Sequence, residues 1–149
     1  MKRTTILSIL AASSLGASSA AASLGTECIT ANQTQPYSNS GNGRKINTST
    51  TSTSTFICLG TSSGPLASRS VTVVDLSPGA VSCFLQRSDS SGQVTWSSPT
   101  VSSSGSSSTL QTLPFPSPGG SGNTYGITCS IPVDGGLGAR SGIVSYDVI

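Results

Sequence analysis

The chain has 149 residues, of which only 8% are charged, and it contains no histidine. Its formal net charge is +2, but without the first 22 residues, which include Lys2 and Arg3, five basic residues balance five acidic ones. A neutral chain with so few charges lacks the electrostatic surface that binds nucleic acid, so we expect no nucleic-acid partner.

The first 22 residues have the layout of a secretory signal peptide. Lys2 and Arg3 form a basic start, residues 6–15 supply a short apolar run, and Ala20–Ala22 offers a cleavage site of small residues. A membrane anchor needs about 20 apolar residues, and serines interrupt this run too early, so we expect no membrane insertion of the mature chain. We therefore divide the chain into a signal peptide, 1–22, and one domain, 23–149, that is exported to the extracellular space, the cell surface or the periplasm.

Four cysteines follow the cleavage site, and an even number in an exported chain is typical of disulfides. The lack of histidine and of closely spaced cysteine pairs argues against a metal site, and we expect no cofactor. Of the three possible connectivities we favour Cys28–Cys58, which would tie down the N-terminal segment, together with Cys83–Cys129, whose members lie on the apolar faces of two expected strands.

Short strand patterns separated by turn signals follow one another along the chain. In chain order, the strongest patterns lie at 56–59, 71–76, 81–85, 93–96, 125–131 and 142–149. In the first of these, Phe56 and Cys58 point one way while Ile57 and Leu59 point the other. No segment after the signal peptide has a helical apolar stripe of useful length. The pattern predicts an all-β fold, an antiparallel β-sandwich of about seven short strands with two disulfides.

The stretch from Val71 to Leu85 is the predicted centre of the core. Two apolar runs flank the Pro-Gly turn at 77–80, and we interpret them as a β-hairpin. This register places five side chains on one buried face: Val74, Leu76, Val81, Cys83 and Leu85. We expect the rest of the core to include Phe56, Trp96, Tyr125, Ile127, Val144 and Tyr146.

The opposite face of this hairpin carries Val71, Val73 and Phe84, although a sheet with one solvated face should be polar there. Serine-rich loops can cover these residues, and scattered exposed apolar side chains are common. The alternative is that the three residues form a contact surface for a partner protein or for another copy of the chain.

The sequence offers little for catalysis. The usual base of nucleophilic catalysis, histidine, is missing, and no G-x-S-x-G motif is present. Only two of the five carboxylates, Asp75 and Asp147, lie inside expected strands, where they could form a glycosidase pair. Trp96 could stack on a sugar ring, but Val94 on the same face favours core packing. We expect a non-catalytic module that acts by binding or assembly, the alternative being a carbohydrate-binding or carbohydrate-active domain.

Several short motifs occur together in a fixed order. These are Tyr37 before a glycine turn, Asn47, a strand ending at Cys58, Val-Thr-Val-Val-Asp, Val-Ser-Cys, Tyr-x-x-x-Cys-x-Ile-Pro and Ser-Gly-Ile-Val-Ser-Tyr. In this combination the chain resembles a group of small exported bacterial β-rich proteins of unknown function. The resemblance covers most of the chain after residue 22 and implies no activity.

Overall fold

The computed structural model describes residues 22–60, 66, 68–105, 107–119, 124–136 and 138–148. The predicted signal peptide lies outside these residues, apart from Ala22. Within the described ranges, no helix has both the length and the apolar character needed to cross a membrane.

The described chain forms strands joined by loops, with one short 3-10 turn, η1 (Gly25–Glu27). The strands are β1 (Ser23–Leu24), β2 (Ile29–Thr30), β3 (Tyr37–Asn39), β4 (Lys45–Asn47), β5 (Ser54–Gly60), β6 (Arg69–Asp75), β7 (Ser82–Ser88), β8 (Val94–Ser97), β9 (Val101–Ser102), β10 (Ser107–Pro114), β11 (Thr124–Ile131) and β12 (Gly142–Val148). Seven of these strands have four or more residues.

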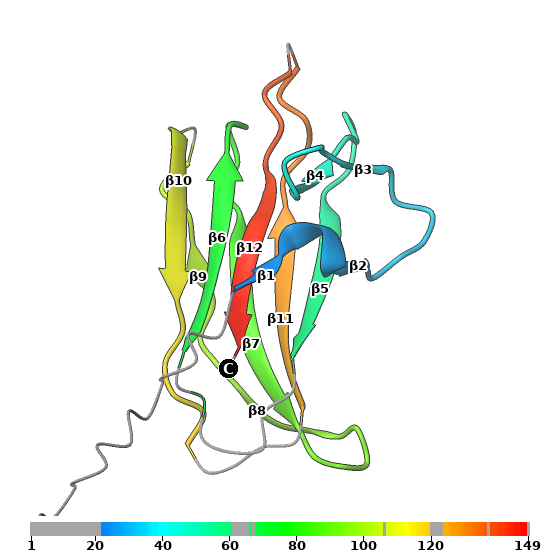
Figure 1. The fold of residues 1–149 in the computed structure, drawn as a ribbon. Helices are drawn as coiled ribbons and strands as arrows, with labels where there is room; N and C mark the ends of the chain where they lie inside the picture. Colours follow the sequence, from blue (N-terminus) through cyan, green and yellow to red (C-terminus); the bar gives the residue numbers. More distant parts are fainter. Residues whose placement is uncertain are drawn as a thin grey trace, which may run out of the picture.

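The strands form two antiparallel sheets that pack face to face (Figure 1). Sheet A has the order β10-β6-β12-β4-β3, with β1 also paired to β12. Sheet B has the order β2-β5-β11-β7-β8, with β9 also paired to β7. The predicted antiparallel β-sandwich is therefore confirmed.

Alternating side chains from both sheets fill the space between the layers. The buried cluster includes Phe56, Val71, Val73, Val81, Leu85, Tyr125, Ile127, Ile131, Ile143 and Tyr146. Along β11 the burial pattern alternates strictly, because odd-numbered residues face sheet A and even-numbered ones face away. At about 25 cal/mol for each Å² of apolar surface buried, this cluster supplies the main stabilising free energy of the fold.

The interpretation of Val71–Leu85 as a hairpin is wrong. Strand β6 lies in sheet A between β10 and β12, whereas β7 lies in sheet B between β11 and β8, so the Pro-Gly loop carries the chain from one sheet to the other. As a result Val71 and Val73 point into the core and are fully buried, whereas Leu76 lies in the crossover and is only half-buried. The predicted inward set of β7 is correct, since it follows from alternation along that strand alone.

Two further core predictions, for Val144 in β12 and Val74 in β6, differ from the structure. The pairing of β12 with β6 shifts register between Ile143 and Ser145, so one extra residue is inserted. Ile143 and Tyr146 therefore both face inward, and Val144 is only half-buried, contrary to prediction. Val74 is buried as predicted, but on the outer side of sheet A, where it lies in one row with Ile46, Gly142 and Leu110.

Candidate interaction surface

Both disulfides lie on the inner face of sheet B. Cys83 and Cys129 face each other directly across β7 and β11, and their Cα atoms are 4.1 Å apart. Cys28 precedes β2 and joins Cys58 of β5, also with a Cα–Cα distance of 4.1 Å. The predicted connectivity is confirmed, and all four side chains are buried in the core. Disulfides of this kind are typical of domains in extracellular or periplasmic compartments.

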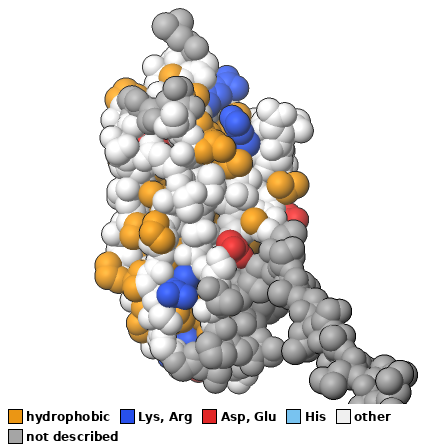
Figure 2. All heavy atoms as spheres, turned by 60° about the vertical axis from the view of Figure 1, so that its left-hand side comes forward, with side chains coloured by type: hydrophobic (Ala, Val, Ile, Leu, Met, Phe, Trp, Pro, Cys, Tyr) orange, Lys and Arg blue, Asp and Glu red, His pale blue; other side chains and the backbone are white. Residues whose placement is uncertain are grey.

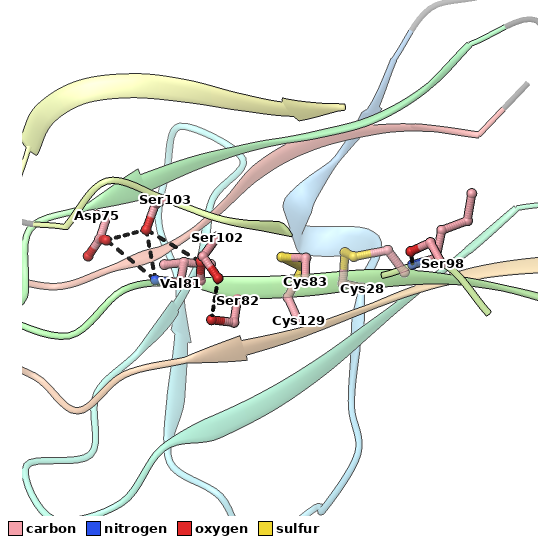
Figure 3. The surroundings of a disulfide bond; sticks show 11 residues. Cys28, Asp75, Val81, Ser82, Cys83, Ser98, Ser102, Ser103 and Cys129 are labelled. Atoms are coloured by element: carbon pink, nitrogen blue, oxygen red, sulfur yellow. Dashed lines mark hydrogen bonds between the residues drawn. A yellow bond between two sulfur atoms is a disulfide. The ribbon is translucent and has the colours of Figure 1, made fainter. Parts of the chain in front are cut away.

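Asp75, one of the two candidate catalytic carboxylates, is fully buried at the crossover between the sheets. Its Oδ1 accepts a hydrogen bond from the Ser141 hydroxyl at 2.8 Å, and its Oδ2 accepts one from Ser103. Ser103 also accepts the backbone N–H of Val81 at 2.8 Å (Figure 3), and Ser141 accepts that of Leu76 at 3.0 Å. The carboxylate thus joins three loops, which is a structural role.

Asp147, the other candidate, does not approach Asp75. It pairs with Ser70, five residues before Asp75 on β6, which places the two aspartates about 17 Å apart along the sheet. They also lie on opposite faces, since Asp75 shares the inward face with Val71 and Val73 while Asp147 follows the inward Tyr146. Glycosidase carboxylates lie about 5–9.5 Å apart, so these two cannot form such a pair.

Trp96, the candidate sugar-stacking residue, is half-buried in β8. It lies opposite Arg87 and packs against the core cluster. Among the described rings, the one stacked or edge-on pair is Tyr37 with Phe56, whose centroids are 6.3 Å apart. Among the residues that the structure describes, Trp96 therefore has no aromatic neighbour with which to form a platform for a sugar ring.

Lys45 lies with Tyr37 and Phe56 where the two sheets meet at one edge. Its side chain is buried, and its ammonium donates a hydrogen bond to the carbonyl of Cys28. The ammonium also lies 4.3 Å from the centroid of the Tyr37 ring and 5.8 Å from that of Phe56, in cation–π geometry. Burial lowers the pKa of Lys45 below its usual 10.5. In the part of the chain that the structure describes, the one ion pair joins Arg140 and Asp134, so this ammonium has no carboxylate partner.

The predicted contact surface of Val71, Val73 and Phe84 does not exist in that form. The two valines are fully buried inside the sandwich, because β6 and β7 belong to different sheets. Phe84 does point outward from sheet B and is half-buried. Directly opposite it on β11 lies Thr128, which in turn lies opposite Ile57 of β5.

An apolar row therefore crosses the outer face of sheet B. Ile29 of β2 lies opposite Ile57 of β5, and Phe84 of β7 extends the row beyond Thr128. Leu59 stands beside this row, opposite Gly126 of β11. Ile29 is 52% exposed and Leu59 is 55% exposed, although an antiparallel sheet facing water should be polar at these positions.

Sequence patterns contain part of the signal for this surface. In 56–59 both the odd and the even positions are apolar, so one pair had to face away from the core. Ile29 gives no such signal, because its place beside Ile57 depends on how β2 pairs with β5.

The outer face of sheet A has a different character. There Val74 is only 3% exposed, and a Cβ atom added to Gly142 would lie 2.6 Å from Cγ2 of Ile46. The side chain of Ile46 thus closes over the glycine, whereas Leu110 on the edge strand β10 remains exposed at 53%. Figure 2 shows hydrophobic side chains in separate groups among polar ones, with few charged side chains.

The described residues include no group of three or more His, Cys, Asp or Glu side chains placed to hold a metal ion. No protein-family model matches the chain, and a comparison with curated proteins finds no match either.

Proposed function

We propose that the domain is an exported, non-catalytic module that acts by associating with another protein through the outer face of sheet B. The observation that carries the proposal is the apolar row of Ile29, Ile57 and Phe84 with Leu59 beside it. Contiguous apolar side chains on a solvated sheet face are typical of protein–protein contact sites.

The rest of the fold supports a binding role. Asp75 and its serine partners hold the crossover together, and all four cysteines are in disulfides, so these groups serve the scaffold. Both disulfides brace the strands that carry the outer face of sheet B. A rigid, preformed surface binds at a lower cost in conformational entropy than a mobile one.

Site-specific photocrosslinking in a host that exports the protein tests this proposal. A photoreactive phenylalanine analogue replaces Leu59 in one variant and Leu110 in the control, two leucines of nearly equal exposure on different sheets. We expect a covalent protein adduct on illumination of the variant at position 59 and none at position 110. Equal adducts at both positions, or none at position 59, would contradict the proposal.

A further inference from the structure

We infer that the partner of the outer face of sheet B is the same face of a second copy of this chain, in a two-fold symmetric dimer. This inference rests on the proposed function, because it names the occupant of the surface described above.

The first argument is the charge of the face. Strand pairing places on this face the outward residues of β2, β5, β7, β8, β9 and β11, which are apolar side chains such as Ile29, Leu59 and Phe84 together with serines, threonines, a glutamine and a glycine. None of these described residues is charged. A two-fold interface brings a surface against itself, so any charge near the axis would meet its own copy. An uncharged face avoids this repulsion and needs no complementary partner.

The second argument is the shape of the face. The middle strand, β11, contributes only small side chains to this face, and Gly126 and Thr128 lie between the larger side chains of β5 and β7. A Cβ atom at Gly126 would lie 3.5 Å from Cδ2 of Leu59, so the leucine lies close over the glycine. Such a face suits aligned packing against another sheet, in which side chains of the two faces interdigitate across about 10 Å.

The third argument is area. The strands of sheet B contain 30 residues, and at about 4.8 Å between strands and about 3.3 Å per residue they cover on the order of 500 Å² per copy. Two copies would bury on the order of 1,000 Å², which is near the lower limit for a specific interface. The dimer is therefore weak and depends on protein concentration.

Sedimentation velocity of the purified mature domain over a concentration series tests the inference. The wild type and Leu110→Lys should shift from monomer to dimer as the concentration rises. Leu59→Lys should dissociate at least about tenfold more readily, because it places an ammonium without a carboxylate partner in the contact. Ile29→Lys gives a second test, since Ile29 is equally exposed and lies on another strand.

The outcomes separate this inference from the proposed function. A wild type that stays monomeric at its highest soluble concentration overturns the dimer, and so does equal weakening by Leu59→Lys and Leu110→Lys. If the adduct at position 59 then contains a different protein, the binding function stands without the dimer. If no adduct forms at all, both fall.

Discussion

At the scale of single residues, adjacent serines have different roles. Ser103 points inward and connects Asp75 with the backbone of Val81, whereas Ser102 points outward and bonds to Ser82 at 2.9 Å (Figure 3). Alternation along an extended segment puts these two side chains on opposite faces. The same substitution at the two positions therefore separates a buried hydrogen bond from an exposed one.

Ser103→Ala should lower the free energy of unfolding by about 1–3 kcal/mol, because it removes a hydrogen-bond donor from buried Asp75. Ser102→Ala should change it by no more than about 0.5 kcal/mol, since its partner remains in contact with water. Chemical denaturation of both variants checks the difference. Similar losses for the two serines would show that the buried network contributes no more than a surface contact.

Lys45 makes stability depend on pH in a specific direction. Its pKa in the folded state lies below 10.5, the ordinary value that applies to the unfolded chain. At a pH between the folded-state pKa and 10.5, the unfolded chain therefore binds more protons than the folded one. Stability from this group therefore rises as the pH rises through that window. Burial raises the pKa of Tyr146 above its ordinary 10.0. The contribution of this tyrosine to the free energy of unfolding is therefore lost as the pH rises beyond 10.0. Below pH 10 the lysine effect is isolated.

We expect the free energy of unfolding of the wild type to increase relative to that of Lys45→Met as the pH rises toward 10.5. The methionine keeps much of the buried aliphatic volume but does not titrate. Denaturation curves for both proteins across this range provide the measurement. Parallel pH dependence in the two proteins would mean that Lys45 titrates normally in the folded state.

At the scale of elements, the two disulfides support strands that differ in how well they are otherwise held. Cys83–Cys129 joins β7 to β11, which pair over seven positions. Cys28–Cys58 holds β2, which pairs with β5 over two positions only. Removal of Cys28–Cys58 should therefore loosen β2 locally, whereas removal of Cys83–Cys129 should act on the whole sandwich.

Cys83→Ala with Cys129→Ala should lower the global free energy of unfolding by about 4 kcal/mol, from the chain entropy that the bridge removes. Cys28→Ala with Cys58→Ala removes a similar chain-entropy term and should in addition accelerate hydrogen exchange and proteolysis around β2 and the loop that follows it. Native-state hydrogen exchange distinguishes the two patterns. Uniform loss of protection in both double variants would contradict the local role of Cys28–Cys58.

A further element illustrates what pattern analysis misses. Asn47 in β4 is fully buried, and its amide nitrogen donates to the carbonyls of Ser52, Ile131 and Pro132. Its oxygen accepts the N–H of Ser49 at 2.8 Å. These bonds hold the threonine- and serine-rich loop after β4 against the end of β11. Composition alone marks that segment only as polar.

At the scale of the whole molecule, the sequence predicted the architecture because alternation and cysteine placement are properties of individual strands. The inward sets of β7 and β11 follow from alternation without knowledge of the other sheet, and Cys83–Cys129 was favoured among three connectivities because both cysteines lie on those inward faces. Pairing between strands was not predictable in the same way. Whether a four-residue Pro-Gly loop closes a hairpin or crosses between sheets depends on distant groups, here Ser103 and Ser141.

The surface on sheet B was predicted only in part for the same reason. Phe84 was correctly placed on the face away from the core, but Val71 and Val73 were assigned to that face through a hairpin that does not form. The apolar neighbours of Phe84 come instead from β5 and β2. Their positions depend on β11 lying between β5 and β7, a long-range arrangement that no local pattern encodes.

The placement of the disulfides has a mechanical consequence. The loops closed by Cys28–Cys58 and Cys83–Cys129 contain every described strand except β1, β6 and β12. A few strand ends also lie outside the loops, namely the last two residues of β5, Ser82 of β7 and the last two residues of β11. The exceptions are neighbours in sheet A, and β1 lies antiparallel to β12 with Ser23 opposite Tyr146. Tension applied at Ser23 and Val148 would unzip this pair one hydrogen bond at a time. Only about 50 residues could then extend, by about 170 Å in place of about 430 Å for the reduced chain, so the covalent loops would keep most of sheet B out of the path of the load.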